Sequence, residues 1–244
     1  MAAPMHHPSS PAERLLVALD TSDRAAAEQL MQEVAPYVGG FKIGKTLFTA
    51  AGPPVVAAAL ATGARVFLDL KFHDIPHTVA GAVAAVMQLG VHLCTVHTLG
   101  GRAMLQAAVE PLAALPPGRQ RPTILGVTLL TSADQATLDE IGLAGTPEEV
   151  VLRLARLAVD CGLGGVVCSP QEVAAVRRLV PKDFAIVTPG IRLPDAIPDD
   201  QRRVLTPRAA LAAGATYLVV GRPITAAANP AAAAQRIVED LATL

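Results

Sequence analysis

Short apolar segments alternate with longer, mostly amphipathic segments along the whole chain of 244 residues. The short segments are rich in Val, Ile and Leu, which is typical of strands buried on both faces of a parallel sheet. The longer segments carry apolar side chains at helical spacing. The predicted strands are 15–20, 40–43, 65–70, 93–97, 123–128, 165–168, 184–188 and 217–220. The predicted helices are 24–35, 55–61, 79–89, 102–115, 148–160, 171–179, 208–213 and 230–241.

This repeated order of strand and helix predicts an α/β protein. Eight such pairs in a chain of this length are typical of a single-domain (β/α)8 TIM barrel. An open, doubly wound sheet is the alternative, but no G-x-G-x-x-G motif follows the first predicted strand. Residues 1–12 contain several prolines and no apolar pattern. We therefore expect a disordered tail over residues 1–12 and one TIM-barrel domain over residues 13–244.

Charge and composition exclude several classes of partner. The formal net charge of −1, from 20 basic and 21 acidic side chains, gives no general attraction to nucleic acid or acidic membranes. Aromatic residues make up only 3% of the chain, so platforms for stacking nucleic-acid bases are not expected. The uncharged stretch 46–64 approaches membrane-spanning length, but Gly52-Pro53-Pro54 interrupts it. We expect neither a nucleic-acid partner nor a membrane span.

The cysteines and the N-terminal segment indicate a compartment. Cys94, Cys161 and Cys168 are odd in number and lack C-x-x-C spacing, as expected for reduced thiols in a core. The apolar run 15–19 is too short for a signal peptide and ends at Asp20. Together these features predict a cytoplasmic protein.

The most informative stretch is Asp69-Leu70-Lys71-Phe72-His73-Asp74-Ile75-Pro76. Because side chains alternate along a strand, Asp69 and Lys71 are predicted to share one face. A buried strand rarely places an acid and a base on one face unless they pair or react. Asp74 follows the strand, and Pro76 is suited to the first position of a helix. Two acids and a base are therefore gathered where a strand leads into a helix.

Other polar residues also follow predicted strands, and the substrate of a TIM barrel binds at those C-terminal ends. Gly221 and Arg222 follow the last strand, where a glycine backbone and a guanidinium can bind a phosphate. The long, proline-rich loop 189–206 has the character of a lid or binding loop. The predicted site residues at these strand ends and in this loop are Asp20, Lys42, Asp69, Lys71, Asp74, Thr131, Ser132, Arg192, Gln201, Gly221 and Arg222.

Lys42, Asp69, Lys71 and Asp74 can form an alternating charge array. Carboxylates beside Lys71 favour its ammonium form, which can donate a proton, over the neutral amine that a Schiff base requires. A purely structural cluster of salt bridges is the alternative. Asp69, Asp74 and His73 could also be metal ligands, but Lys42 occupies the neighbouring strand, so no metal is expected. His92 and His97 bracket a strand and are interpreted as structural.

The stretch 69–76 resembles the signature of the orotidine 5′-monophosphate decarboxylase family. Further segments that are similar to this family occur in order along the chain, and His77-Thr78 replaces the family's common Asn-Thr. These segments are Val-Ala-Leu-Asp at 17–20, Phe-Lys-Ile-Gly at 41–44, Gly-Val-Thr-Leu-Leu-Thr-Ser at 126–132, Thr-Pro-Gly-Ile-Arg at 188–192, Asp-Gln-Arg-Arg at 200–203 and Gly-Arg-Pro-Ile-Thr at 221–225.

The resemblance implies a carboxy-lyase that converts orotidine 5′-monophosphate into uridine 5′-monophosphate and CO2, the last step of pyrimidine nucleotide synthesis, without a cofactor. It also implies a homodimer in which Asp74 and Thr78 reach the partner's site. Under this resemblance Lys71 protonates C6 of the pyrimidine, and Asp69 lies near the departing carboxylate. The implied substrate contacts are Lys42 and Asp20 to the ribose, Thr131 and Ser132 to the pyrimidine edge, Gln201 to base and phosphate, and Arg192, Gly221 and Arg222 to the phosphate.

Two other functions stay open on the residues alone. The first is a metal-dependent sugar-phosphate decarboxylase or aldolase on a similar barrel, which would share the pattern Asp-x-Lys-x-x-Asp. Lys42 counts against it, because such enzymes have a metal-binding acid at that position. The second is a non-catalytic barrel that binds nucleotides.

Overall fold

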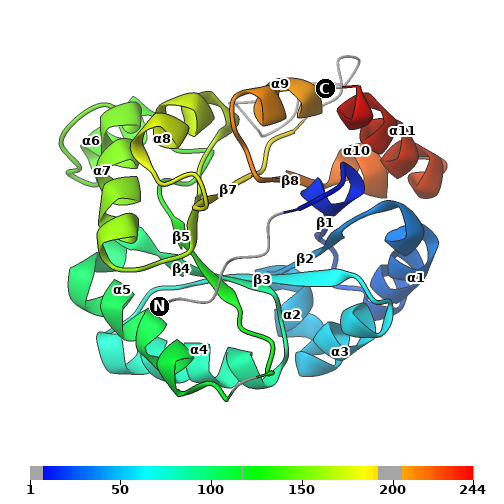
Figure 1. The fold of residues 1–244 in the computed structure, drawn as a ribbon, viewed down its shortest axis with the longest axis horizontal. Helices are drawn as coiled ribbons and strands as arrows, with labels where there is room; N and C mark the ends of the chain where they lie inside the picture. The colour runs from blue at the N-terminus through cyan, green and yellow to red at the C-terminus, as the bar shows by residue number, and fades with distance from the viewer. Residues whose placement is uncertain (1–7, 117, 192–204, 244) are drawn as a thin grey trace.

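The computed structural model describes residues 8–116, 118–191 and 205–243, within which eight parallel strands close into a barrel in the order β1 to β8 (Figure 1). The strands are β1 (Leu15–Leu19), β2 (Gly40–Gly44), β3 (Arg65–Phe72), β4 (Leu93–His97), β5 (Thr123–Val127), β6 (Gly165–Val167), β7 (Ala185–Thr188) and β8 (Tyr217–Val220). The helices are α1 (Arg24–Val34), α2 (Lys45–Ala51), α3 (Pro53–Ala61), α4 (Pro76–Gln88), α5 (Gly101–Val109), α6 (Gln135–Glu140), α7 (Pro147–Asp160), α8 (Val173–Leu179), α9 (Pro207–Ala212), α10 (Arg222–Thr225) and α11 (Pro230–Ala242).

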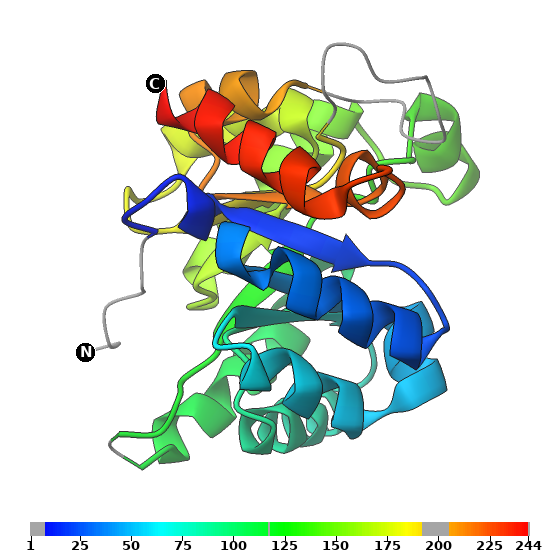
Figure 2. The ribbon, with the colours of Figure 1, turned by 90° about the vertical axis from the view of Figure 1, so that its right-hand side faces the viewer.

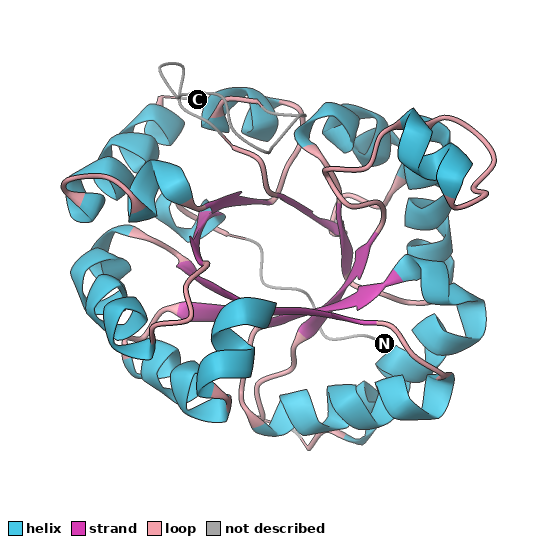
Figure 3. Ribbon diagram, turned by 180° about the vertical axis from the view of Figure 1, so that it is seen from behind, coloured by secondary structure: helices cyan, strands magenta, loops and turns pink. Residues whose placement is uncertain are grey.

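Pairing between the first and last strands closes the barrel. β1 pairs with β8 in parallel, with Leu15 opposite Leu218 and Val17 opposite Val220. This closure confirms the TIM-barrel prediction and excludes the open sheet. Helices surround the strands in Figure 3, and Figure 2 shows β1 running between α1 and α11.

Two apolar layers hold the barrel together. Side chains that point into the barrel, among them Leu16, Phe67 and Tyr217, form an inner cluster. Those on the opposite face of each strand, such as Leu15 and Leu68, pack with the surrounding helices in a larger cluster. Full burial of one such side chain contributes about 1.5–3 kcal/mol of transfer free energy. The strands are therefore apolar on both faces, which is why they were recognised as continuous apolar runs.

The structure adds three short helices that the sequence pattern did not predict. α2 and α3 are separated by Gly52, whose φ of 64° is in the left-handed region that favours glycine. α6 follows β5 and begins with a capping box in which Asp134 accepts a hydrogen bond from the Thr137 N–H. α10 spans only Arg222–Thr225. Each of these helices is too short for an apolar period to identify it.

Most other boundaries agree to within three residues, but the predicted helix 102–115 is α-helical only over Gly101–Val109 and continues as a 3-10 helix over Glu110–Ala114. One further difference affects the site. β3 continues to Phe72 rather than ending at residue 70. Of the tail predicted over residues 1–12, residues 1–7 lie outside the described part, and Ser9 donates hydrogen bonds to the Glu13 carboxylate. The disorder of the tail therefore stays a prediction. No helix in the described ranges combines the length and apolar character needed to cross a bilayer.

The three cysteines Cys94, Cys161 and Cys168 are buried and are not joined in disulfide bonds, as the sequence predicted. Burial, and then the negative charge of Asp69, raises the pKa of Cys94 to about 12. The Cys94 thiol is consequently protonated at neutral pH and is a packing group rather than a nucleophile.

Candidate active site

The inward-facing positions change character along the strands. Near the start of β3 the inner cluster contains Phe67, and two residues further on Asp69 lines an open cavity. β1 follows the same order, with Leu16 and Ala18 in the inner cluster and Asp20 directly beyond the strand. Because inward positions recur every second residue, β1 and β3 each change from apolar side chains inside the barrel to a carboxylate at its rim. The rim lies at the C-terminal ends of the strands, where the substrates of TIM barrels bind.

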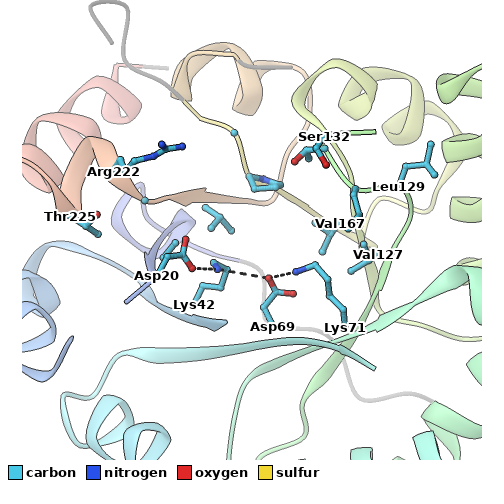
Figure 4. A pocket seen from close by; sticks show the side chains of 17 residues that line it. Asp20, Lys42, Asp69, Lys71, Val127, Leu129, Ser132, Val167, Arg222 and Thr225 are labelled. Atoms are coloured by element: carbon cyan, nitrogen blue, oxygen red, sulfur yellow. Dashed lines mark hydrogen bonds and ion pairs between the residues drawn. The ribbon is translucent and has the colours of Figure 1, made fainter. Parts of the chain in front are cut away.

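Four charged side chains form an alternating row across this rim (Figure 4). Lys42 Nζ lies 2.8 Å from Asp20 Oδ1 and 3.9 Å from Asp69 Oδ2. Lys71 Nζ lies 2.8 Å from the same Asp69 oxygen. The Asp69 side chain is only 11% exposed, so its interactions are screened less than those of surface pairs. The row confirms that Lys42, Asp69 and Lys71 come together, and it adds Asp20.

Lys71 reaches Asp69 by an irregular path. Leu68 pairs with Cys94 and Phe72 pairs with Val96, so three residues of β3 lie opposite one residue of β4. Within this bulge Lys71 has a φ of 54°, and it is the one non-glycine residue in the described chain with a positive φ. A left-handed lysine costs about 1–2 kcal/mol relative to regular backbone. The alternation of side chains along a strand therefore does not by itself explain why Lys71 and Asp69 lie together. A strained bulge directs the Lys71 side chain toward Asp69.

Thr95 on β4 is part of the site and was missed from the sequence. Its Oγ1 accepts a hydrogen bond from the Lys71 backbone N–H at 2.9 Å and donates one to Asp69 Oδ1 at 2.9 Å. The Thr95 side chain is fully buried. Alternation along the predicted strand 93–97 gave a usable signal, because Thr95 lies two residues after the inward-facing Leu93.

The cavity above the charged row has a volume of about 660 Å³. Such a volume is in the usual range of pockets for small ligands. Val127, Leu129 and Val167 line it as an apolar wall, on the side of the cavity toward Lys71 in Figure 4. The sequence did not identify this wall, because valines on buried strands have the same pattern whether they face a core or a ligand.

The remaining predicted residues divide into two groups. Thr131, Ser132, Gly221 and Arg222 line the cavity, and Arg222 lies across it from Lys71 (Figure 4). Arg192 and Gln201 lie outside the described residues, so their predicted roles stay predictions.

Asp74 and Thr78 are on the exposed segment that follows β3, and they are not among the residues that line the cavity of their own chain. The Asp74 carboxylate accepts a hydrogen bond from the Ile75 N–H at 2.6 Å. Within one chain the second acid of the row is thus Asp20 rather than Asp74. The place of Asp74 in the array stays a prediction that concerns a second subunit.

The three histidines near β3 and β4 have different surroundings. His92 Nδ1 accepts the Val66 N–H at 3.2 Å, which is the structural role expected for it. His73 and His97 stack with ring centroids 5.4 Å apart. Burial, followed by the positive charges of His73, Lys71 and Lys45, lowers the pKa of His97 to about 4. His97 is therefore neutral at physiological pH.

Folding should become less favourable as the pH falls from about 6.5 to about 4, because His97 binds a proton in the unfolded chain but not in the folded one. The His97→Asn variant should lose part of this pH dependence, since asparagine does not titrate. Urea unfolding at a fixed protein concentration and at several pH values measures the slope. An unchanged slope in the variant would show that His97 does not cause the loss of stability.

The donor set at the rim is a poor match for a divalent metal. Lys42 places an ammonium 3.9 Å from Asp69, where a second carboxylate would be needed to hold a cation. The residues that the structure describes contain no group of three or more His, Cys, Asp or Glu side chains able to hold a metal ion. The rim is arranged instead for ion pairing between lysines and carboxylates.

Fold and site together define a TIM-barrel enzyme with a lysine–carboxylate row at the floor of its cavity and an arginine across from it. Comparison with known families gives the same class in more detail. Residues 13–237 match the family described as orotidine 5′-phosphate decarboxylase / HUMPS, and the chain belongs to this family.

Relatives that are similar over nearly the full length agree with this assignment. A protein of Halorhodospira halophila named orotidine 5′-phosphate decarboxylase is 55% identical over 229 residues, covering 94% of this chain and 96% of that protein. One of the same name from Nitrosospira multiformis is 53% identical and covers 93% of both chains. The crystal structure of orotidine 5′-phosphate decarboxylase from Lactobacillus acidophilus superposes with a TM-score of 0.82 at 38% identity, covering 93% of this chain and 98% of that one.

Proposed function

We propose that this protein is a carboxy-lyase that converts orotidine 5′-monophosphate into uridine 5′-monophosphate and CO2 in pyrimidine biosynthesis. The observation that carries the proposal is the row Asp20, Lys42, Asp69 and Lys71 at the floor of the cavity. The proposal draws further support from relatives about half identical in sequence that bear the name of this activity. It requires no cofactor.

The reaction needs a positive charge beside one carbon atom of the substrate, C6 of the pyrimidine. When the bond between C6 and the carboxylate breaks, the electron pair stays on C6 of a ring that has no good electron sink. A cofactor commonly supplies such a sink, but a fixed ammonium can stabilise the same charge. In our proposal the Lys71 ammonium lies beside C6, stabilises the developing carbanion and gives it a proton. Lysine then regains its proton from water. Asp69, held between two ammonium groups, lies near the departing CO2.

The rest of the cavity supplies binding energy away from the reacting carbon. We assign Asp20 and Lys42 to the ribose hydroxyls, and Thr131 and Ser132 to the pyrimidine edge. Binding contacts remote from C6 can lower the barrier by holding the substrate against the charged row. The residues assigned to the phosphate end are Gly221 and Arg222, together with Arg192 and Gln201, which lie outside the described residues.

Replacing Arg222 with alanine should weaken the binding of uridine 5′-monophosphate by about 1.5–3 kcal/mol, the value of one charged hydrogen-bonded contact. The affinity for uridine, which has no phosphate, should change little. Titration calorimetry with both ligands measures the difference. Arg208→Ala is the matched control, because Arg208 bonds to Thr243 away from the cavity. Equal losses for the nucleotide and the nucleoside would contradict a phosphate site at Arg222.

We further propose that two chains form a homodimer in which Asp74 and Thr78 complete the partner's site. The support is an exposed segment next to the site: His73, Asp74 and Ile75 are all exposed, and Ile75 has 66% of its surface accessible. Contact with a second chain at this segment would cover the isoleucine side chain and bring Asp74 close to the other subunit. Light scattering should give a mass of two 25.1 kDa chains, and a mass of one chain would contradict the proposal. A cytoplasmic location, which we also propose, is supported by three buried cysteines that are not joined in disulfide bonds.

The deciding experiment follows the absorbance of orotidine 5′-monophosphate after purified protein is treated with a chelator. Loss of absorbance, with uridine 5′-monophosphate as the product, supports the metal-free decarboxylase. Activity that disappears with the chelator and returns with magnesium would favour the metal-dependent sugar-phosphate enzyme. Tight binding of uridine 5′-monophosphate without turnover would favour a non-catalytic barrel.

A further inference from the structure

One hydroxyl group connects the backbone of Lys71 to the carboxylate of Asp69. We propose that Thr95 is a positioning residue for the decarboxylation, and that its single hydroxyl holds both Lys71 and Asp69 in place. The inference rests on the proposed function, because it assigns Thr95 a part in the same reaction. Thr95 itself does not line the cavity, so its effect on a bound substrate would pass through its two neighbours.

The direction of both hydrogen bonds is fixed by chemistry. A backbone N–H can only donate, so Thr95 Oγ1 must accept the Lys71 N–H at 2.9 Å. The one hydroxyl hydrogen of Thr95 then remains for Asp69 Oδ1, also at 2.9 Å, and a carboxylate can only accept. The Thr95 hydroxyl is therefore an acceptor and a donor at the same time. A valine, which has the shape of threonine but no hydroxyl, would break both contacts together.

The first contact stabilises the bulge that directs Lys71. In this irregular part of β3 the Lys71 N–H bonds to the side chain of Thr95, which occupies the single β4 position opposite residues 69–71. A buried N–H that loses its partner is costly, and a left-handed lysine is already strained. Loss of the hydroxyl therefore favours a different backbone path for Lys71.

The second contact orients the carboxylate. With Oδ1 held by Thr95, Oδ2 faces Lys71 Nζ at 2.8 Å and Lys42 Nζ at 3.9 Å. Rotation of the freed Asp69 carboxylate would change both distances. Reactions that depend on placed charges are sensitive to displacements below 1 Å. Thr95 thus connects the strand pairing to the position of the ammonium that is to donate the proton.

The test compares Thr95→Val with Thr95→Ser, which keeps the hydroxyl. Thr95→Val should lower kcat by about 10- to 100-fold with a much smaller change in KM, as is common when a supporting contact of a reactive group is removed. Thr95→Ser should keep kcat within about threefold of the wild-type value. The matched control is Thr216→Val, which removes a buried hydroxyl that accepts the Ile186 N–H at 3.0 Å just before β8, at the end of the barrel opposite the site. The control should lose some stability but retain kcat.

A double-mutant cycle separates positioning from a general loss of structure. Because one of the two contacts of Thr95 is with Asp69 and the other is with the Lys71 backbone, Thr95→Val should lower kcat by clearly fewer fold when Asp69 is already asparagine, without losing its effect completely. If Thr95→Val does not fold, Thr95→Cys, whose thiol is a weak donor and acceptor, takes its place in the cycle. Wild-type kcat in the hydroxyl-free variant, an equal loss in Thr216→Val, or full additivity with Asp69→Asn would overturn the inference. A wild-type protein without decarboxylase activity would instead overturn the proposed function.

Discussion

Replacing Lys71 with alanine should lower kcat by at least about 10⁴-fold while the barrel stays folded. The variant loses both the proton donor and the positive charge beside C6, and each of these is worth several powers of ten in comparable sites. Alanine keeps the Cβ atom that lysine already has at the left-handed φ of 54°, so the substitution adds no new backbone strain. The rate of absorbance loss at saturating substrate gives kcat, and full activity in the variant would rule out the proposed role of Lys71.

Two controls separate lost chemistry from lost structure. Lys182→Ala removes an exposed lysine that lies between α8 and β7, at the end of the barrel opposite the site, and it should leave kcat unchanged. Mixing Lys71→Ala with Asp74→Ala should restore about a quarter of the wild-type activity if the sites are completed across a dimer, because one site in each hybrid dimer is then intact. No recovery, from variants shown to exchange subunits, would mean that Asp74 acts within its own chain or not at all.

The alternation of apolar and polar segments was sufficient to predict the barrel and to place several candidate residues around one cavity. The apolar runs give the order of the strands, and the C-terminal ends of all strands in such a barrel lie at one end of it. Lys42 and Asp69 could therefore be placed together from the sequence alone. The position of Asp20 in the row follows from the same rule. Its ion pair with Lys42 at 2.8 Å adds a contact that spacing along the chain does not specify.

The features that the sequence did not reveal depend on pairing between strands. The bulge of β3 exists because Leu68 and Phe72 pair with Cys94 and Val96, and no local pattern in either strand encodes that register. Alternation along the strand could have placed Thr95 inside the barrel, but its two contacts depend on the residues opposite it in β3. The strain at Lys71 occurs where the reactive ammonium is placed. Local rules are expected to fail at such positions, because function there outweighs the most stable backbone.

Asp69→Asn is expected to reduce kcat by about 10²- to 10³-fold and also to lower stability. The wild-type carboxylate compensates two ammonium groups, at 2.8 Å and 3.9 Å, whose side chains are only 26% and 13% exposed. A neutral amide of the same shape leaves Lys42 and Lys71 as neighbouring like charges, which pushes Lys71 away from C6. Kinetics at saturating substrate and urea unfolding measure the two effects. A variant that kept its stability but lost activity would show that Asp69 acts on the substrate alone.

The same variant decides whether Asp69 also repels the substrate carboxylate before it leaves. Orotidine 5′-monophosphate carries that carboxylate, whereas uridine 5′-monophosphate does not, so repulsion weakens the binding of the first ligand only. In a Lys71→Ala background, which prevents turnover, Asp69→Asn should tighten the substrate relative to the product by about tenfold, or 1.4 kcal/mol. Calorimetry with both nucleotides gives this ratio. An unchanged ratio would mean that Asp69 contributes by holding Lys71 in place, and that the catalytic gain lies in the stabilised carbanion rather than in a destabilised substrate.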